Sequence, residues 1–262
     1  MKKKLFICGI SALMVGMVSC NSQKKDTKSS DTEVVTTADN SQNSLDWDGF
    51  YSGILPCADC GGIQTSLELL KDGTYELKQV YWGKDDNSFY SFGNLTWNKE
   101  GNTITIGEDE SVMKFQVGEN ALTMLDKEGN KITGDLADNY ILAKVDMNLV
   151  EKYWKLTELF GEAVVTPENG KEAHMILKKE GNRVNGNSGC NSFSGTYTLK
   201  PGNRIYFSKV ASTMMMCINM DTEKKMHQVL ETADNYVVNG DTLVLNKARM
   251  APLARFEAVY MK

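Results

Sequence analysis

The chain has 262 residues, of which 41% are hydrophobic and 24% are charged, and its formal net charge is −5 at neutral pH. This composition is typical of a globular protein of one or two domains and excludes a collagen, a coiled coil and a wholly disordered chain. The acidic balance argues against a nucleic-acid-binding protein, which needs a basic face. The chain has only two histidines, His174 and His227, so a three-histidine zinc site is excluded.

The first 19 residues are typical of a secretory signal peptide. Lysines at positions 2–4 precede an apolar stretch, residues 5–18, that is too short to span a bilayer. The stretch ends in Met-Val-Ser-Cys, which resembles the lipobox of bacterial lipoproteins, whose cysteine receives lipid and becomes the mature N-terminus. The resemblance implies that Cys20 carries lipid, such as palmitate, and anchors the chain without a span. An ordinary signal peptide with a chance cysteine is the alternative.

Residues 20–46 are predicted to be a lipidated, flexible tether. They are rich in Ser, Thr, Asp, Asn and Lys, and they cannot bury enough apolar surface to offset the entropy lost on ordering. A flexible coil of this length averages roughly 28 Å from end to end. Asn21 follows Cys20, and in enteric bacteria an asparagine there resembles the address of the outer membrane. We therefore expect an outer-membrane lipoprotein of the cell envelope that faces the periplasm or the cell exterior.

Residues 47–145 are predicted to form short antiparallel strands. Residues 63–69 and 75–81 alternate apolar and polar side chains on either side of a turn at 71–73, which is the pattern of a β-hairpin. Further glycine-containing turns at 99–102, 117–120 and 127–130 adjoin strand-like runs at 103–106 and 121–125. Turns at this spacing, without helical periodicity, favour a meander sheet or a small barrel.

A short hinge at 146–150 leads to a second β-rich region, residues 150–262. Strand patterns are present at 153–160, 173–178, 183–187, 195–199, 204–208, 236–238, 242–245 and 255–261. One helix is predicted to begin at Asp221 as its N-cap, with an apolar side formed by Met226, Val229, Leu230 and Ala233. The predicted fold class is therefore mainly β, with two small antiparallel sheet or barrel domains, the second of them α+β with one helix.

The first β-rich region carries Tyr-Ser-Gly-Ile-Leu-Pro-Cys-Ala-Asp-Cys-Gly-Gly-Ile at 51–63, and Asp-Gly-Thr-Tyr follows at 72–75. These motifs resemble the N-terminal domain of the NlpE family, lipoproteins of copper homeostasis and envelope stress. The resemblance implies a lipocalin-like barrel over residues 47–145, a part in the envelope-stress response and copper tolerance, and no enzymatic activity. It also implies an envelope signalling protein as a partner, besides the membrane reached through the lipid.

The second region carries Asn-Gly-Asn-Ser-Gly-Cys-Asn-Ser-Phe-Ser-Gly-Thr-Tyr at 185–197 and Ser-Thr-Met-Met-Met-Cys at 212–217. A helix with Glu223 and a Gly-Asp-Thr-Leu hairpin at 240–243 follow in order. This arrangement resembles the META domain, the HslJ-like family of secreted or lipid-anchored bacterial proteins. The resemblance implies a META domain over residues 150–262, without catalytic chemistry, as a second interaction surface. Better-known NlpE members carry a different C-terminal barrel, so signalling through that barrel is not expected here.

Four cysteines remain once the signal peptide has left and the lipobox cysteine carries lipid. The periplasm is oxidising, so disulfides are the expected state of these cysteines. Because two fall in each β-rich region, we expect one pair per domain, Cys57 with Cys60 and Cys190 with Cys217.

Three interpretations of the Cys-Ala-Asp-Cys motif at 57–60 stay open. A disulfide between Cys57 and Cys60 locks a turn at the mouth of the barrel. In the reduced form, the two soft thiolates bind Cu(I), and no other metal or cofactor is expected. A thioredoxin-like pair, which makes the protein a thiol-disulfide oxidoreductase, is disfavoured because strands flank the motif and because the charge of Asp59 opposes thiolate formation.

The methionine run at 214–216, ahead of Cys217, also offers soft sulfur ligands. Adjacent residues of a strand point to opposite faces, so we expect these methionines to pack in the core instead. His174 and His227 have no nucleophile at a recognisable spacing, so no catalytic residue is assigned. The predicted function is that of a non-enzymatic envelope protein. The alternative is a carrier of a small apolar ligand, with a barrel mouth lined by Tyr81, Trp82, Phe89, Tyr90, Phe92 and Trp97.

Overall fold

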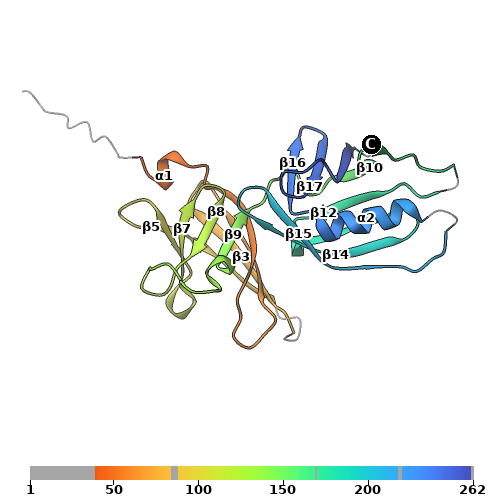
Figure 1. Cartoon of the computed structure of the whole chain (residues 1–262). Coiled ribbons are helices and arrows are strands. Elements are labelled where there is room, and N and C mark those ends of the chain that lie inside the picture. Colours follow the sequence, from red (N-terminus) through yellow and green to blue (C-terminus); the bar gives the residue numbers. More distant parts are fainter. Residues whose placement is uncertain (1–38, 84–87, 169, 218–219, 261–262) are drawn as a thin grey trace, which may run out of the picture. The chain divides into compact units, whose positions relative to one another are not determined.

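The computed structural model describes residues 39–260, apart from 84–87, 169 and 218–219 (Figure 1). The predicted signal peptide, Cys20 and most of the predicted tether lie outside the described residues. Within the described part of the chain, no helix has the length and apolar character needed to cross a membrane. The described residues contain two nine-stranded sheets, in which every strand pairing is antiparallel.

The first sheet is a nearly closed, barrel-like meander. Hairpin pairings connect β1 to β4 and β5 to β9, and the pairing of β1 with β9 joins the two groups, so β4 and β5 are the edges. This arrangement confirms the predicted antiparallel meander. The elements are α1 (Ser41–Ser44), β1 (Gly49–Leu55), β2 (Ile63–Leu69), β3 (Thr74–Tyr81), β4 (Ser88–Asn94), β5 (Thr96–Trp97), β6 (Thr103–Ile106), η1 (Asp109–Ser111), β7 (Met113–Gly118), β8 (Ala121–Met124), η2 (Ala137–Asn139) and β9 (Ile141–Lys144).

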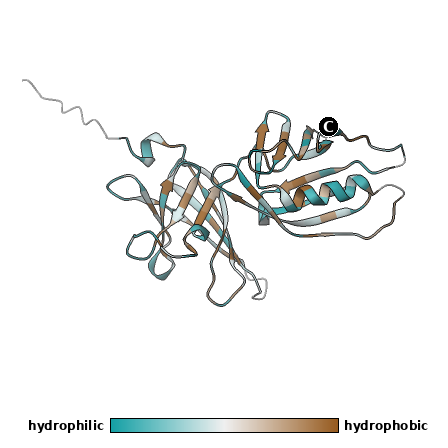
Figure 2. Cartoon of the chain, in the orientation of Figure 1, coloured by the Kyte–Doolittle hydropathy of each residue, from teal (hydrophilic) through white to brown (hydrophobic). Residues whose placement is uncertain are grey.

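Alternation along the strands builds the core of this sheet. Leu67 and Leu69 of β2 are buried, while the polar residues that precede each of them are partly exposed. Tyr51, Ile104 and Phe115, from three other strands, are fully buried in the same cluster. Figure 2 shows hydrophobic and hydrophilic residues alternating along the strands, as expected for a sheet with one buried face.

The second sheet closes on itself, because its last strand pairs with its first. Tyr153 of β10 lies opposite Val259 of β18, and this pairing completes a ring of strands. The short β11 pairs only with β10 among the described strands. The elements are β10 (Tyr153–Leu159), β11 (Glu162–Ala163), β12 (His174–Lys178), η3 (Glu180–Asn182), β13 (Arg183–Asn187), β14 (Ser192–Lys200), β15 (Arg204–Ser212), α2 (Asp221–Thr232), β16 (Asn235–Asn239), β17 (Thr242–Asn246) and β18 (Ala254–Val259).

Helix α2 packs its apolar side on the core of the second sheet. Met226, Val229 and Leu230 are buried in one cluster with strand residues such as Trp154, which confirms the predicted apolar side of the helix. The predicted N-cap is wrong by one residue: Met220 is the N-cap and makes no side-chain capping bond, and Asp221 is the first helical residue. An aspartate in the first turn still interacts favourably with the helix dipole.

The predicted hinge at 146–150 is also wrong in part. Leu149 and Val150 are buried in the core of the second sheet, and the indole Nε1 of Trp154 donates a hydrogen bond to the main-chain oxygen of Leu149 at 2.8 Å. The predicted strands omit β1, β4, β5, β7, β9 and β11. Strand β4 has neither a buried residue nor a regular polar–apolar alternation, so the pattern that identifies the other strands is missing there.

Candidate functional site

Residues 56–62, here called the cysteine turn, join β1 to β2 in the first sheet. Cys57 and Cys60 form a disulfide across this turn, with their Cα atoms 5.3 Å apart. Two main-chain hydrogen bonds fix the turn against Trp82: the Gly61 N–H donates to the Trp82 oxygen at 3.1 Å, and the Trp82 N–H donates to the Gly62 oxygen at 3.0 Å. The position of the turn is therefore held by the main chain as well as by the sulfur–sulfur bond.

Gly62 is required at the end of the cysteine turn. Its φ of +138° is a conformation that side-chain-bearing residues rarely adopt. A Cβ at this position would also lie 2.8 Å from Cγ2 of Ile54, which is closer than two carbon atoms pack. The sequence motif thus includes a glycine with a local structural reason.

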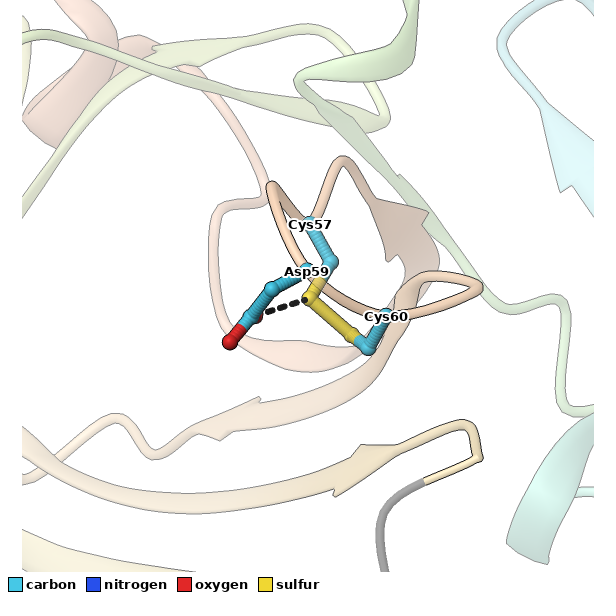
Figure 3. Close-up of side chains that lie close together, drawn as sticks. All are labelled: Cys57, Asp59 and Cys60. Carbon is cyan, nitrogen blue, oxygen red and sulfur yellow. Dashed lines mark hydrogen bonds between the residues drawn. A yellow bond between two sulfur atoms is a disulfide. The ribbon is translucent and has the colours of Figure 1, made fainter.

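The cysteine turn gathers two sulfurs and a carboxylate. The ligand atoms of Cys57, Asp59 and Cys60 all lie within 4.8 Å of one another, and an Asp59 carboxylate oxygen is 3.5 Å from Sγ of Cys57 (Figure 3). Both cysteines are half-buried, whereas Asp59 is exposed. In the disulfide form neither sulfur is a thiolate. After reduction, the same three groups can surround one soft cation, because both sulfurs already come from one turn.

A second feature of the first sheet is a cavity of about 350 Å³ beside the cysteine turn. Leu55 and Pro56, which lead into the turn, form part of its wall. The remaining wall is mostly apolar, with a few polar groups, and this composition is typical of small-molecule sites. The lining residues on the strands include Ile63, Tyr75, Leu77, Gln79, Tyr81, Phe89, Ser91, Ile106, Met113 and Met124.

Of the six aromatic residues expected at the barrel mouth, Tyr81 and Phe89 line this cavity. The expectation is wrong for the other four. Tyr90 and Phe92 alternate with the lining residues of β4 and are exposed to solvent. Trp82 bonds to the cysteine turn, and Trp97 makes an edge contact with Trp47. Strand periodicity explains the split, since residues i and i+1 face opposite ways.

Several polar groups of the cavity wall make hydrogen bonds to other parts of the first sheet. The Tyr75 hydroxyl accepts a hydrogen bond from the Gly107 N–H at 3.1 Å and shares another with Oγ of Ser91 at 2.9 Å. The buried amide of Gln79 donates to Oγ1 of Thr65 at 3.4 Å. These bonds connect β3 to β2, to β4 and to the residue that follows β6.

In the second sheet, the Cys190–Cys217 disulfide joins the turn after β13 to the segment after β15. The side chain of Asn191 connects the same parts. Its Oδ1 accepts from the Met215 N–H and from the Thr213 hydroxyl, both at 2.7 Å, and its Nδ2 donates to the Met215 oxygen at 2.9 Å. Asn191 is thus a buried link whose importance the sequence motif alone did not reveal.

Asn191 also binds the buried carboxylate of Glu223 on α2. The Asn191 main-chain N–H donates to Oε2 of Glu223 at 2.9 Å, and Nδ2 donates to Oε1 at 3.1 Å. A buried carboxylate needs such donors, because removing it from water is otherwise costly. This pair explains the glutamate that follows the second motif block in the sequence.

The methionine run does not pack in the core, so the expectation from the sequence is wrong. Met214 and Met216 are 99% and 97% exposed, and Met215 is 47% exposed. The segment is not a strand, because β15 ends at Ser212, and the argument from strand alternation therefore does not apply. Among the described residues, the buried methionines are Met175 on β12 and Met226 on α2.

The two histidines occupy structural positions. The His174 ring stacks on Tyr153 with centroids 4.3 Å apart, and its Nδ1 lies 3.0 Å from the main-chain oxygen of Glu172. Burial, together with the hydrogen bond to Glu172, raises the pKa of Tyr153 to about 12. His227 on α2 makes an edge contact with Phe193, and its buried Nε2 has no hydrogen-bond partner.

Comparison with known proteins bears on both sheets. Residues 51–135 match the family model of the NlpE N-terminal domain, and residues 147–260 match that of the META domain. Both resemblances drawn from the sequence motifs are thereby confirmed. Lipoprotein NlpE of Escherichia coli (strain K12) is 37% identical over 102 residues, which are 38% of this chain and 42% of that protein. The chain thus matches less than half the length of this curated relative.

Two solved structures are similar to parts of the chain. The crystal structure of a protein from Shewanella oneidensis is 52% identical, with 42% of this chain and 98% of that chain covered and a TM-score of 0.39. The Cpx pathway activator NlpE from Escherichia coli is 20% identical, with 63% of this chain and 94% of that chain covered and a TM-score of 0.29.

Proposed function

We propose that this chain, in which an NlpE N-terminal domain is followed by a META domain, is a non-enzymatic outer-membrane lipoprotein that responds to copper stress through its cysteine turn. The observation that carries the proposal is the cluster of Cys57, Asp59 and Cys60 within 4.8 Å on a turn fixed by its main chain. The Escherichia coli relative is a lipoprotein by name, and this supports the lipid anchor.

The proposed copper chemistry depends on the redox state of the turn. In the disulfide, the sulfurs of Cys57 and Cys60 are bonded to each other and neither is a thiolate. Reduction yields two thiolates, which are the ligands that Cu(I) prefers, and the Asp59 carboxylate adds negative charge near the ion. Protons compete with copper for the thiolates, so the affinity falls as the pH falls.

Competition with a chromogenic Cu(I) chelator tests this site on the reduced mature chain. We expect the Cys57→Ser, Cys60→Ser variant to lose Cu(I) binding, and the Met214→Leu, Met216→Leu variant to retain it. The Cys190→Ser, Cys217→Ser variant is the matched control for loss of two cysteines. The opposite pattern would place the ion at the methionines. A parent chain that does not bind Cu(I) would contradict the proposed copper site and would show that the disulfide of the turn has a structural role.

Lipid attachment at Cys20 is the proposed route to the membrane. We expect Cys20→Ala to release the protein into the soluble envelope fraction, since no described helix offers another anchor. Persistent membrane fractionation of this variant at high salt would contradict the proposal. An envelope-stress reporter extends the test to signalling: the wild-type chain is expected to induce the reporter on overproduction and the released variant is not. The proposal also assigns the META domain as a second interaction surface.

The cavity beside the cysteine turn favours one other function, that of a carrier for a small apolar ligand. Its volume of about 350 Å³ and mostly apolar wall fit such a ligand. Binding of N-phenyl-1-naphthylamine, followed by fluorescence, tests this function. Ser91→Phe fills the cavity and is expected to abolish binding, whereas Ser88→Phe places the same ring on the other face of β4 and is expected to leave it intact. Equal binding by both variants would exclude the cavity as the site.

A further inference from the structure

In the segment from Thr213 to Cys217, here called the methionine segment, hydrogen bonds and a disulfide hold the main chain, while the side chains of Met214 and Met216 stay in solvent. The Asn191 side chain bonds both the N–H and the oxygen of Met215. The Thr213 N–H donates to the Ser192 oxygen at 3.0 Å, and Cys217 is tied to Cys190. Every one of these constraints acts on the main chain or on Thr213 and Cys217, and none of them involves the side chains of Met214 and Met216.

The exposed fractions of the described methionines cover the whole range, with Met147 at 54% and Met250 at 65% between the extremes. Met214 and Met216 are 99% and 97% exposed, as a free side chain would be, whereas Met175 and Met226 are fully buried. A thioether in solvent reacts with peroxide, and a thioether in a packed core is shielded from it. The cell envelope, the location proposed for the chain, is an oxidising compartment in which exposed thioethers meet oxidants. This step rests on the proposed envelope location alone and is independent of copper binding.

We propose that Met214 and Met216 are a site of two-electron oxidation by peroxides. The lone pair of the thioether sulfur attacks one peroxide oxygen, an S–O bond forms and the O–O bond breaks. The sulfur is oxidised by two electrons to the sulfoxide, and the peroxide, with its protons, is reduced to water. The product is polar, and methionine sulfoxide is reversible by dedicated reductases. Because neither side chain packs against the fold, the oxidised chain keeps its structure.

Hydrogen peroxide on the folded mature chain, with N-acetylmethionine amide in the same tube, tests the site. Oxidation is followed by peptide mass spectrometry after reduction and alkylation; the tryptic peptide 210–224 carries the segment, and fragmentation locates each oxygen. We expect Met214 and Met216 to react within threefold of the free amide, and Met175 and Met226 to react at least tenfold more slowly. Rates at Met214 and Met216 more than threefold below the free amide would overturn the proposal.

Two controls test whether the fold causes the difference in oxidation rate and whether the side chains of Met214 and Met216 support the fold. In guanidinium chloride the four rates are expected to converge, which shows that the fold is the source of the difference. The Met214→Leu, Met216→Leu variant is expected to take up two fewer oxygen atoms than the parent during the rapid part of the oxidation. It is also expected to unfold at the same temperature as the parent. The parent oxidised only at these two residues is expected to keep its melting temperature within about 2 °C; a larger fall would show that the side chains support the fold and would overturn the proposal.

Discussion

The two cysteine pairs of this chain occupy opposite kinds of surroundings. Cys57 and Cys60 are three positions apart on one turn that its main chain already fixes. Cys190 and Cys217 are 27 positions apart, and Cys190 is almost fully buried. In the chain-entropy model the shorter loop contributes about 2 kcal/mol to stability and the longer loop about 3.5 kcal/mol. The short pair can therefore be reduced with a small loss of stability, while the long pair contributes more to the stability of the second sheet.

Removing each pair in turn is the strongest test of this contrast. We expect Cys190→Ser, Cys217→Ser to lower the free energy of unfolding by about 3–4 kcal/mol, since it frees the methionine segment from the turn after β13. Cys57→Ser, Cys60→Ser is expected to cost about 2 kcal/mol or less. Urea denaturation of the oxidised mature proteins measures both. Equal losses would show that the short pair is also a staple.

The second test removes the hydrogen-bonded link beside the long pair. We expect Asn191→Ala to cost about 2–3 kcal/mol, because the buried Glu223 carboxylate and the Met215 main chain lose bonding partners. The affinity of the reduced chain for Cu(I) is expected to stay unchanged, since the cysteine turn lies in the other sheet. Urea denaturation and chelator competition give the two values. A loss below about 0.5 kcal/mol would mean that solvent replaces the link without penalty.

The third test asks whether the main chain, rather than the disulfide, fixes the cysteine turn. Gly62→Ala introduces a side chain at φ +138° and a contact of 2.8 Å with Ile54, so we expect a cost of about 1–3 kcal/mol. Gly73→Ala in the 71–73 turn is the control, because that glycine also has a positive φ but open space around its Cβ. If both variants lose the same stability, the crowding at Ile54 has no effect and strain of the φ angle alone explains the loss.

The smallest expected effect is electrostatic. The hydrogen bond from Lys155, with an Nζ–O distance of 2.6 Å, holds the pKa of Glu172 below its ordinary value of 4.5. The stabilisation is present above pH 4.5 and is lost as the pH falls through the lowered pKa. Both side chains are more than a third exposed, so Glu172→Gln is expected to cost under about 0.5 kcal/mol at pH 7 and less at pH 3. A difference between variant and parent that is the same at both pH values would contradict this account.

Much of the fold followed from local pattern. The hairpin at 63–81, the strand at 183–187 and the apolar side of α2 are where alternation and helical periodicity place them. Strand β4 escaped prediction because an edge strand buries little, and its aromatic residues therefore carry no alternation. The closure of β10 on β18 is a long-range pairing that no local pattern encodes.

For the candidate sites, the sequence predicted the contacts between neighbouring residues but not those between distant segments. Sequence spacing put Cys57, Asp59 and Cys60 on one turn, and the structure contains that cluster. The links from Asn191 to Met215 and Glu223 join segments 24 and 32 positions apart, so neighbouring residues gave no sign of them. The methionine run was misplaced because burial was inferred from side-chain type, although the adjoining strand ends at Ser212.

The closed ring of the second sheet has a consequence for how this region folds. The first strand, β10, pairs with β18, which is synthesised about a hundred residues later, so the ring stays open until nearly the whole region exists. Contacts of such long sequence separation slow folding, because the entropy of closing the loop is lost before the contacts form. A nascent chain interrupted before Ala254 therefore leaves one edge of β17 and one edge of β10 without a partner strand, and such edges promote aggregation. For a chain that is to be exported, this favours folding only after translocation is complete.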